Sequence, residues 1–596
     1  MQPEIYYQEK LQDLQLQLSI QLKYKSKLGW LRFIIALFII VSVYFLWPAG
    51  LAFVIPVPVI LLIVFVKLVF ADNKNKYAIQ HTRHLININE DEVKALDDDY
   101  YHFAEGNEFL PKDHFYANDL DIFGRASLFQ YINRTTSEMG GNTLAQWLLR
   151  PADAGTILKR QIAIKELSAK TEWRQQFQAY GKEQIIKNTT QQRLSIWLNE
   201  PDKFLQFKHW MWIRYVLQAI IITVLFLNIF DDLPTRILNI FLLVYAVIAY
   251  TISKKVSPIH QQLSKMVAEL DVLSDSIQLI EKAQFTSPLL QQLQAQYQQQ
   301  KSKSSYELNQ LKKILERLDL RYNPVVFIPL AIFLLWDLQQ VLALEKWKKY
   351  NEQNVIQWFD VLGNFEALNS LSTLCFNNAG WSFPLLHDKH FFIEGKQIGH
   401  PLISKTKRVV NDIFLDKTGE LMLVTGSNMA GKSTYLRSVG INIVLAMAGA
   451  PVCAKCFILS PVQLISSMRI ADNLEESTST FYAELKKLKT IIDKVNNGER
   501  VFILLDEILR GTNSLDRHIG SIALIKQLIK HNAAGIIATH DVELAKMQET
   551  YAADILNYHF DVQVSHEELH FDYLLKPGIC TSMNASILMK KIGIEL

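Results

Sequence analysis

Long apolar runs alternate with polar, helix-forming stretches along the first two-thirds of the chain. No charged residue lies between Phe33 and Val66, and this run would be about 51 Å long as one helix, well beyond the ~30 Å hydrocarbon core of a bilayer. The sequence WPAG at 47–50 breaks the run, so the pattern predicts two membrane-spanning helices joined by a tight turn. Basic residues flank the pair and are absent from the turn, which places both ends in the cytoplasm.

A second pair of apolar runs, Val216–Phe230 and Ile237–Ile252, repeats this pattern around a polar turn at 231–236. Lysine and arginine residues again lie on the outer sides of the pair. Both runs are shorter than the ~20 residues of an ideal span, so a buried pair of core helices is the alternative. We interpret the pair as a second hairpin, which gives four spans in total.

A fifth apolar run, Val325–Trp336, ends at Asp337. It is too short to span a bilayer as a helix. A fifth span would also carry the C-terminal half of the chain to the outside of the cell, where nucleotide is scarce. The sequence therefore predicts a buried core helix here.

The polar stretches between the runs indicate an all-α region. Asp119–Pro151 is expected to form helices broken at Gly140-Gly141, because paired glycines disfavour a helix interior. From His260 to Arg321 apolar residues recur at three- and four-residue steps in a glutamine-rich background. This spacing favours long paired helices, although an ordinary helical bundle has the same spacing.

The last 180 or so residues change to short apolar strands alternating with helical segments, the pattern of an α/β domain. Strands are expected at Leu421–Thr425, Val501–Leu505 and Gly535–Thr539, and an antiparallel hairpin at Tyr558–Leu575 on the edge of the sheet. The fold class predicted is thus an α/β P-loop NTPase domain at the C-terminus, preceded by an all-α core domain that transmembrane helical hairpins interrupt.

A glycine-rich loop follows the first of these strands and matches the pattern GxxxxGK[ST]. Glycines allow backbone N–H groups to turn inward around phosphate oxygens, and the following helix N-terminus favours negative charge. In this pattern Lys432 reaches the β- and γ-phosphates of ATP and the Ser433 hydroxyl binds Mg²⁺. The predicted cradle comprises Gly426, Ser427, Asn428, Met429, Ala430, Gly431, Lys432, Ser433 and Thr434.

Polar residues also end the other two buried strands. Asp506 and Glu507 follow Val501–Leu505, at the strand end where α/β sheets carry their chemistry. Asp506 suits Mg²⁺ coordination, and Glu507 is placed to polarise the attacking water. His540 follows the third strand and is predicted to hydrogen-bond a γ-phosphate. Lys432, Asp506, Glu507 and His540 are the predicted catalytic residues, with Ser433 and Asp506 as metal ligands.

Composition narrows the class of protein only slightly. Hydrophobic residues make up 49% of the chain and the net charge is +3, too mild to indicate nucleic acid by itself. Four cysteines suit a reducing compartment. Cys453 and Cys456 form one C-x-x-C, but a zinc site normally has a second ligand pair. We interpret these two residues as structural thiols, with a metal or redox role as the alternative.

Several stretches, taken in order, resemble the MutS family of DNA mismatch-repair ATPases. TGSNMAGKSTYLRSVG (425–440) resembles its phosphate loop, ESTSTFYAEL (476–485) the segment that reaches the partner's nucleotide, and LLDEILRGTNSLD (504–516) its extended second motif. IIATHDVEL (536–544) and YLLKPGICTS (573–582) resemble its switch and closing hairpin. The resemblance implies ATP and Mg²⁺ as cofactors, a homodimer in which Ser479 and Thr480 complete the partner's site, and binding of mismatched DNA.

The chain also departs from that family. The first hairpin occupies the space expected for the mismatch-reading and connector domains, and the chain stops at Leu596 without the usual C-terminal helices. The Phe-x-Glu triplet at Phe103 has the form of a mismatch wedge, but the same triplet at Phe392 indicates coincidence. The predicted segments are a polar helix (1–30), hairpin 1 (31–71), helical core (72–209), hairpin 2 (210–253), long helices and core (254–397) and the ATPase domain (398–596).

These features predict a multi-pass protein of the inner (cytoplasmic) membrane with its ATPase domain in the cytoplasm. DNA is a possible partner, and no small-molecule substrate other than ATP is expected. Two other classes stay open. One is an ATP-driven transporter, although ESTSTF stands where an LSGGQ-type segment would precede Asp506. The other is a scaffold whose dimerisation is controlled by nucleotide.

Overall fold

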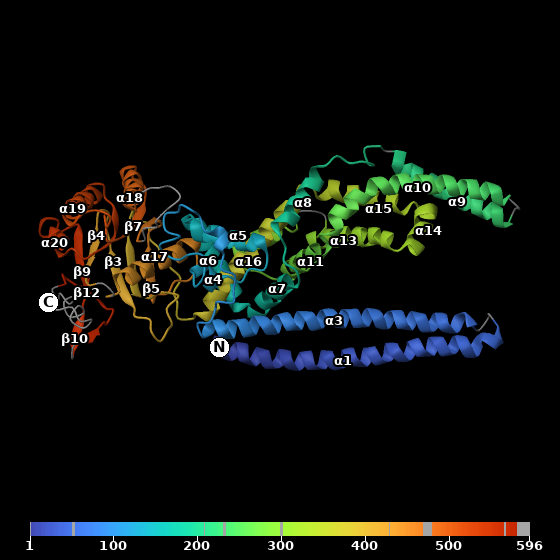
Figure 1. The fold of residues 1–596 in the computed structure, drawn as a ribbon, viewed down its shortest axis with the longest axis horizontal. Helices are drawn as coiled ribbons and strands as arrows, with labels where there is room; N and C mark the ends of the chain where they lie inside the picture. Colours follow the sequence, from blue (N-terminus) through green and yellow to red (C-terminus); the bar gives the residue numbers. More distant parts are fainter. Residues whose placement is uncertain are drawn as a thin grey trace.

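The computed structural model describes residues 2–50, 54–207, 209–230, 234–298, 302–427, 430–468, 480–565 and 568–580. The molecule is elongated, and its two ends differ in architecture (Figure 1). An α/β domain built from the C-terminal third lies at one end. Two helical hairpins extend toward the other end, and a helical body joins them.

The first hairpin consists of α1 (Pro3–Leu46) and α3 (Pro56–Leu96), with a short 3₁₀ turn η1 (Trp47–Ala49) after α1. The polar N-terminal stretch and the first apolar run therefore form one continuous helix. The polar half of the hairpin packs on the helical body through buried side chains such as Leu14 and Ile88. The apolar half has its side chains exposed.

The second hairpin consists of α9 (His209–Phe230) and α10 (Thr235–Ser264). Among the described residues, α1, α3, α9 and α10 are long and apolar enough to cross a membrane, by length and composition. Figure 1 shows the helices of the two hairpins extending in the same direction, away from the α/β domain.

The helical body surrounds α16 (Val355–Asn377), which is buried along nearly its whole length. The other helices of the body are α4 (Leu128–Ile132), α5 (Glu138–Leu149), α6 (Ala154–Ala169), α7 (Thr171–Glu183), α8 (Asn188–Asn199), α11 (Val267–Lys282), α12 (Pro288–Ala295), α13 (Ser304–Asp319) and α15 (Trp336–Asn351), with 3₁₀ turns η2 (Asn107–Phe109) and η3 (Leu320–Tyr322). Between residues 260 and 321 the chain forms the short helices α11, α12 and α13, as in an ordinary helical bundle, in place of the long paired helices that the spacing favours. Of these, α11 packs beside α13.

The predicted break at Gly140-Gly141 is wrong, because α5 runs through both glycines. A Cβ on Gly140 would lie only 1.9 Å from the Glu366 carboxylate of α16. That carboxylate in turn accepts hydrogen bonds from the backbone N–H and hydroxyl of Ser137, the N-cap of α5. Gly140 thus allows the close approach of α5 to α16, whereas Gly141 packs on Phe109, where a Cβ would lie 3.3 Å from the ring. This packing outweighs the low helix propensity of glycine.

The predicted burial of the fifth apolar run is also wrong. This run forms α14 (Pro324–Leu334), whose Val325 and Ile328 side chains are 84% and 55% exposed. Ala331 is the buried residue of the helix. The helix lies across the end of the α13–α15 pair and contacts α9 and α10, so it sits beside the second hairpin and outside the core.

The α/β domain holds a six-stranded sheet in the order β12-β9-β4-β8-β7-β6. All neighbouring strands are parallel except the edge strand β12. The bounds are β4 (Leu421–Thr425), β6 (Gln463–Ser467), β7 (Val501–Asp506), β8 (Ala534–Thr539), β9 (Ile555–Phe560) and β12 (Leu575–Pro577). The three central strands β4, β8 and β7 are buried throughout, as their uninterrupted apolar sequences require.

A second sheet of four strands, in the order β1-β5-β2-β3, completes the domain together with the helices around it. Its strands are β1 (Leu385–Leu386), β2 (Ile393–Ile398), β3 (Asn411–Leu415) and β5 (Cys456–Leu459). The helices are α17 (Lys432–Ala448), α18 (Thr480–Asn496), α19 (Ser514–Lys530), α20 (Val542–Ala545) and α21 (Met547–Thr550). The predicted antiparallel pairing at the sheet edge is present, because β12 pairs antiparallel with the Tyr558–Phe560 end of β9. Between them, β10 (Gln563–Ser565) and β11 (Glu568–His570) form a separate antiparallel pair.

Candidate nucleotide-binding site

The glycine-rich loop connects β4 to α17 at the C-terminal edge of the main sheet. Gly426 and Gly431 both have positive φ angles, 147° and 106°, which disfavour any side chain. A Cβ on Gly426 would lie 2.9 Å from the carbonyl oxygen of Phe560, and one on Gly431 would lie 3.1 Å from the ring of Tyr573. Conformation and close packing thus both require glycine at these two positions.

Lys432, the first residue of α17, is buried and turned back toward the loop. Its ammonium group donates hydrogen bonds to the carbonyl oxygens of Gly426 (2.8 Å) and Ser427 (3.0 Å). The imidazole of His540 lies 3.3 Å from the same nitrogen. Burial lowers the pKa of Lys432 to about 8, because the charged form loses hydration. An incoming anion would restore favourable surroundings for this charge.

Ser433 and Asp506 meet across the edge of the sheet. The Ser433 hydroxyl donates a hydrogen bond of 2.5 Å to one carboxylate oxygen of Asp506. The other oxygen, Oδ1, is buried and has no hydrogen-bond partner, although Arg510 lies 3.9 Å away. A buried carboxylate oxygen of this kind is costly unless a cation or a donor compensates it.

Glu507 follows directly in a left-handed backbone conformation, with φ of 52°. One of its carboxylate oxygens lies 2.5 Å from His540 Nε2, and the other lies 2.9 Å from Arg510 Nε. The hydrogen bond from His540, with the charges of Arg510 and Lys432 nearby, holds the pKa of Glu507 below its usual value. The Glu507 side chain is therefore an ionised acceptor at neutral pH.

The sheet order explains why residues far apart in sequence converge. β4, β8 and β7 are adjacent parallel strands, so their C-terminal ends lie side by side. Lys432, Asp506, Glu507 and His540 follow these strand ends and form one contiguous cluster, with Ser433 beside it. Of the remaining cradle residues, the structure shows Ser427 in the loop, Ala430 buried and Thr434 exposed in α17.

Three predicted residues cannot be placed. Asn428, Met429 and Ser479 lie outside the described residues, and Thr480 is described only as the first residue of α18. The segment predicted to reach a partner's nucleotide is therefore represented here by α18 alone.

Two residues support the site without having been assigned a role from sequence. Arg510 pairs with Glu507 as described above. Glu484 of α18 accepts a hydrogen bond of 2.5 Å from the backbone N–H of Leu509, within the turn that carries Glu507. Next to it, Gly511 packs so closely on Phe481 that a Cβ would lie 2.7 Å from that side chain. In the sequence, the feature that points to this turn is the pair Arg510-Gly511 shortly after Asp506 and Glu507.

The C-x-x-C cysteines and Phe103, the other two features noted in the sequence, are explained by packing or show no metal site. Cys453 is buried with its sulfur 3.1 Å from the Arg408 guanidinium, and burial raises the pKa of this thiol. Within the described ranges there is no cluster of three or more metal-ligating side chains. The ring of Phe103 packs on the guanidinium of Arg134, 3.7 Å from the ring centre, which accounts for this phenylalanine by packing within the chain.

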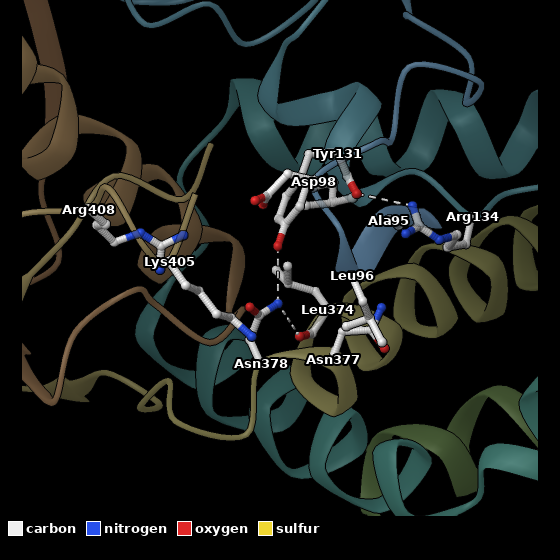
Figure 2. A pocket seen from close by; sticks show the side chains of 11 residues that line it. Ala95, Leu96, Asp98, Tyr131, Arg134, Leu374, Asn377, Asn378, Lys405 and Arg408 are labelled. Atoms are coloured by element: carbon white, nitrogen blue, oxygen red, sulfur yellow. Dashed lines mark hydrogen bonds between the residues drawn. The ribbon is translucent and has the colours of Figure 1, made fainter. Parts of the chain in front are cut away.

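A separate pocket, lined by none of the loop residues, lies between the C-terminal end of α3 and the α/β domain (Figure 2). Figure 2 shows Asp98 and Arg134 on the side of the helical body and Lys405 and Arg408 on the side of the α/β domain. In this pocket the Asn378 amide donates a hydrogen bond of 3.3 Å to the Tyr131 hydroxyl.

A parallel sheet that gathers a lysine, two carboxylates and a histidine at its C-terminal edge is typical of α/β domains that bind nucleotides. The comparison with known proteins agrees: residues 422–592 match the family described as MutS domain V. This part of the chain is therefore similar to the MutS family in its domain V.

Individual relatives give the extent of the similarity. The DNA mismatch repair protein MutS of Aquifex pyrophilus is 34% identical over 224 residues, which are 37% of this chain and 25% of that protein. The protein of the same name from Persephonella marina is 31% identical over 238 residues, 39% of this chain and 27% of that protein. The chain thus spans about a quarter of the length of these relatives.

Proposed function

We propose that this protein is a Mg²⁺-dependent ATPase of the MutS type that is anchored in a membrane. The observation that carries the proposal is the cluster at the edge of the main sheet. Lys432 would bind the β- and γ-phosphates, and the ionised carboxylate of Glu507 would accept a proton from the attacking water. His540 bridges the two, 3.3 Å from the Lys432 nitrogen and 2.5 Å from the Glu507 carboxylate, so it is positioned to respond to the γ-phosphate.

The residues present fit a magnesium ion. Mg²⁺ prefers oxygen ligands and is commonly held by one or two protein side chains together with phosphates. Ser433 and Asp506 supply such oxygens 2.5 Å apart, and Asp506 Oδ1, which is buried without a hydrogen-bond partner, supports a role for a cation at this position. Bound there, Mg²⁺ would neutralise charge on the phosphates of ATP.

Dimerisation is the second part of the proposal, and exposed apolar side chains beside the site support it. Tyr482 and Leu485 lie on one face of α18, and Leu515 and Ile519 lie on one face of α19, all of them exposed. α18 and α19 are the helices that border the turn carrying Glu507 and Arg510. Exposed apolar groups in such a position favour a protein–protein interface, with Ser479 and Thr480 of one subunit completing the site of the other.

Mixed dimers test this arrangement. A subunit with Lys432→Ala loses its own phosphate contact, and a subunit with Ser479→Ala and Thr480→Ala fails to complete its partner's site. In a mixed dimer one composite site carries both defects and the other carries neither. We therefore expect mixing to restore up to half of the wild-type ATPase rate, measured after co-expression with two affinity tags. A rate no higher than that of the separate variants would support a site complete in one subunit.

Membrane insertion is the third part of the proposal. The apolar halves of both hairpins are exposed, although single-chain soluble proteins rarely expose such large apolar surfaces. The two hairpins extend the same way from the body, so one bilayer would accept both (Figure 1). The positive-inside pattern then favours the cytoplasmic membrane with the α/β domain in the cytoplasm.

Cysteine labelling of intact cells tests the topology. We expect a membrane-impermeant maleimide to label Gly50→Cys and Thr235→Cys, which lie at the two hairpin turns. Glu549→Cys, exposed on the α/β domain, should react only after permeabilisation. The native cysteines all lie on the cytoplasmic side in this arrangement and need not be removed. Labelling of Glu549→Cys in intact cells would contradict it.

A role on DNA is the fourth part of the proposal. It is supported by the similarity of the α/β domain to DNA mismatch repair proteins. We expect heteroduplex or branched DNA to stimulate ATP hydrolysis by the purified protein several-fold more than matched duplex does. Absence of stimulation by any DNA would favour the nucleotide-controlled scaffold. ATP-dependent accumulation of a solute in proteoliposomes would favour a transporter.

A further inference from the structure

The helix α14 presents an apolar surface that the fold leaves uncovered. No charged residue lies between Arg321 and Asp337, and Val325 and Ile328 of this stretch are exposed. We propose that α14 lies in the plane of the cytoplasmic leaflet of the membrane, with this surface among the lipid acyl chains, and does not cross the bilayer. The inference rests on the proposed membrane insertion of the second hairpin.

The geometry of the chain excludes a crossing. The α14 helix is only about 16 Å long, roughly half of the hydrocarbon thickness. At Leu335, which adopts a left-handed conformation with φ of 46°, the chain bends by 78° into α15. α15 then returns along α13 toward the helical body (Figure 1). Both ends of α14 are thus on the side of the body.

Polar contacts hold the start of α14 at a defined level of the second hairpin. Arg321 donates hydrogen bonds to the backbone oxygen (3.0 Å) and the hydroxyl (2.7 Å) of Ser253 in α10, directly before Lys254, where the apolar run of that helix ends. The same guanidinium lies 3.6 Å from the buried carboxylate of Asp337. The charges that flank α14 are therefore drawn together on its side toward the body, away from its exposed apolar side.

At the C-terminal end of α14, side chains satisfy a backbone carbonyl group that water would otherwise hydrate. The carbonyl oxygen of Leu334, at the last turn, accepts hydrogen bonds of 2.8 Å from Gln218 of α9 and from Gln339 of α15. Carbonyl groups at a helix C-terminus lack partners within the helix and need one from elsewhere when lipid replaces water. Two glutamine side chains supply it here.

Exposed aromatic residues mark the same level on the hairpin. Trp212 and Tyr215 lie within two turns before Gln218, and Tyr250 lies one turn before Ser253. Tyr322 directly precedes α14 and is exposed as well. Tryptophan and tyrosine are enriched at the boundary between lipid and water. The aromatic residues and α14 together thus define the plane at which the second hairpin would enter the bilayer.

The surface of α14 is continuous with the exposed apolar faces of α9 and α10, which it contacts. This continuity favours lipid as the occupant, because a partner protein on α14 would have to compete with the lipid that covers the hairpin beside it. A second copy of the chain is the competing occupant, and the experiment below separates the two.

The test is spin-label accessibility in the full-length protein reconstituted into liposomes. Single cysteines at Val325, Leu243 and Glu316 are placed in a chain whose four native cysteines are changed to alanine, with nucleotide binding as the check of folding. Leu243 is an exposed residue near the middle of α10's apolar run, and Glu316 is exposed on α13. Oxygen partitions into the acyl chains, whereas a nickel chelate stays in water.

We expect the Val325 label to collide with oxygen and to be protected from nickel several-fold better than the Glu316 label, at a shallower depth than the Leu243 label. A Val325 label open to nickel while Leu243 is protected would overturn this inference alone. A Val325 label protected from both reagents would overturn it in favour of a second copy or another protein. A Leu243 label open to nickel would instead contradict the membrane insertion itself.

Discussion

Replacing Glu507 with glutamine should lower the rate of ATP hydrolysis by about 10²–10⁴-fold while leaving the affinity for Mg-ATP within a few-fold of wild type. Glutamine keeps the size of the side chain and one acceptor oxygen, but it has no negative charge with which to accept a proton from water. The structure supports an ionised glutamate here, because His540 and Arg510 both contact its carboxylate. Initial rates and equilibrium binding of a fluorescent ATP analogue measure the two effects separately.

Two variants control for this result. Lys432→Ala removes the phosphate contact itself and should weaken nucleotide binding together with turnover. Glu543→Gln changes an exposed carboxylate only three residues after His540, where it pairs with Lys546, and should change neither quantity. If Glu507→Gln hydrolysed ATP at the wild-type rate, the proton acceptor would have to be another group.

The sequence predicted most of the α/β domain because its signals are local. An uninterrupted apolar strand must be buried on both faces, and β4, β7 and β8 are buried throughout. Parallel strands then bring the residues at their C-terminal ends to one edge. Lys432, Asp506 and Glu507 needed only these two rules to be assigned to a common site, and the structure finds them together.

In the helical half, the course of α5 and the exposure of α14 could not be predicted from local sequence, because both depend on packing between distant segments. Gly140 and Gly141 look like a helix break in isolation, but Gly140 faces the carboxylate of Glu366, more than 200 residues later, and Gly141 faces the ring of Phe109. The burial of α14 was inferred from its length, since a helix too short to span a membrane was assumed to enter the core. α14 instead packs beside α9 and α10 with its apolar side exposed, an arrangement that its composition does not predict.

A buried ion pair that the sequence does not reveal joins the first hairpin to the helical body. Glu92 of α3 pairs with Arg134, with both side chains only 3% exposed and the nearest atoms 2.5 Å apart. The Asn377 amide at the end of α16 donates a hydrogen bond of 2.8 Å to the same carboxylate, and Tyr7 of α1 donates one of 2.8 Å to Asn377. Arg134 and Asn377 also line the pocket that faces the α/β domain (Figure 2). The base of the hairpin is thus tied to the body beside that domain.

Replacing Glu92 with alanine should therefore destabilise the packing of the hairpin base by about 3–5 kcal/mol, because it leaves the Arg134 charge buried without a partner. Since 1.4 kcal/mol corresponds to tenfold, hydrogen exchange of α1 amides around Tyr7 should accelerate by about 100- to 4,000-fold. The matched control is Lys10→Ala, which removes a pair with the exposed Glu172 across the same junction and should cost less than about 1 kcal/mol.

The same pair predicts a dependence on pH. Burial alone would raise the pKa of Glu92, but the Arg134 charge and the hydrogen bonds from Arg134 and Asn377 outweigh burial, so the pKa lies below its usual value. A carboxyl group with a lowered pKa in the folded state contributes stability above its unfolded pKa, and this contribution is lost as the pH falls through the folded pKa. Exchange at the hairpin base should therefore quicken below about pH 4 in the wild type, relative to Glu92→Ala. Equal protection in both proteins at neutral pH would show that the apolar contacts of Leu14 and Ile88 hold the hairpin without help from the ion pair.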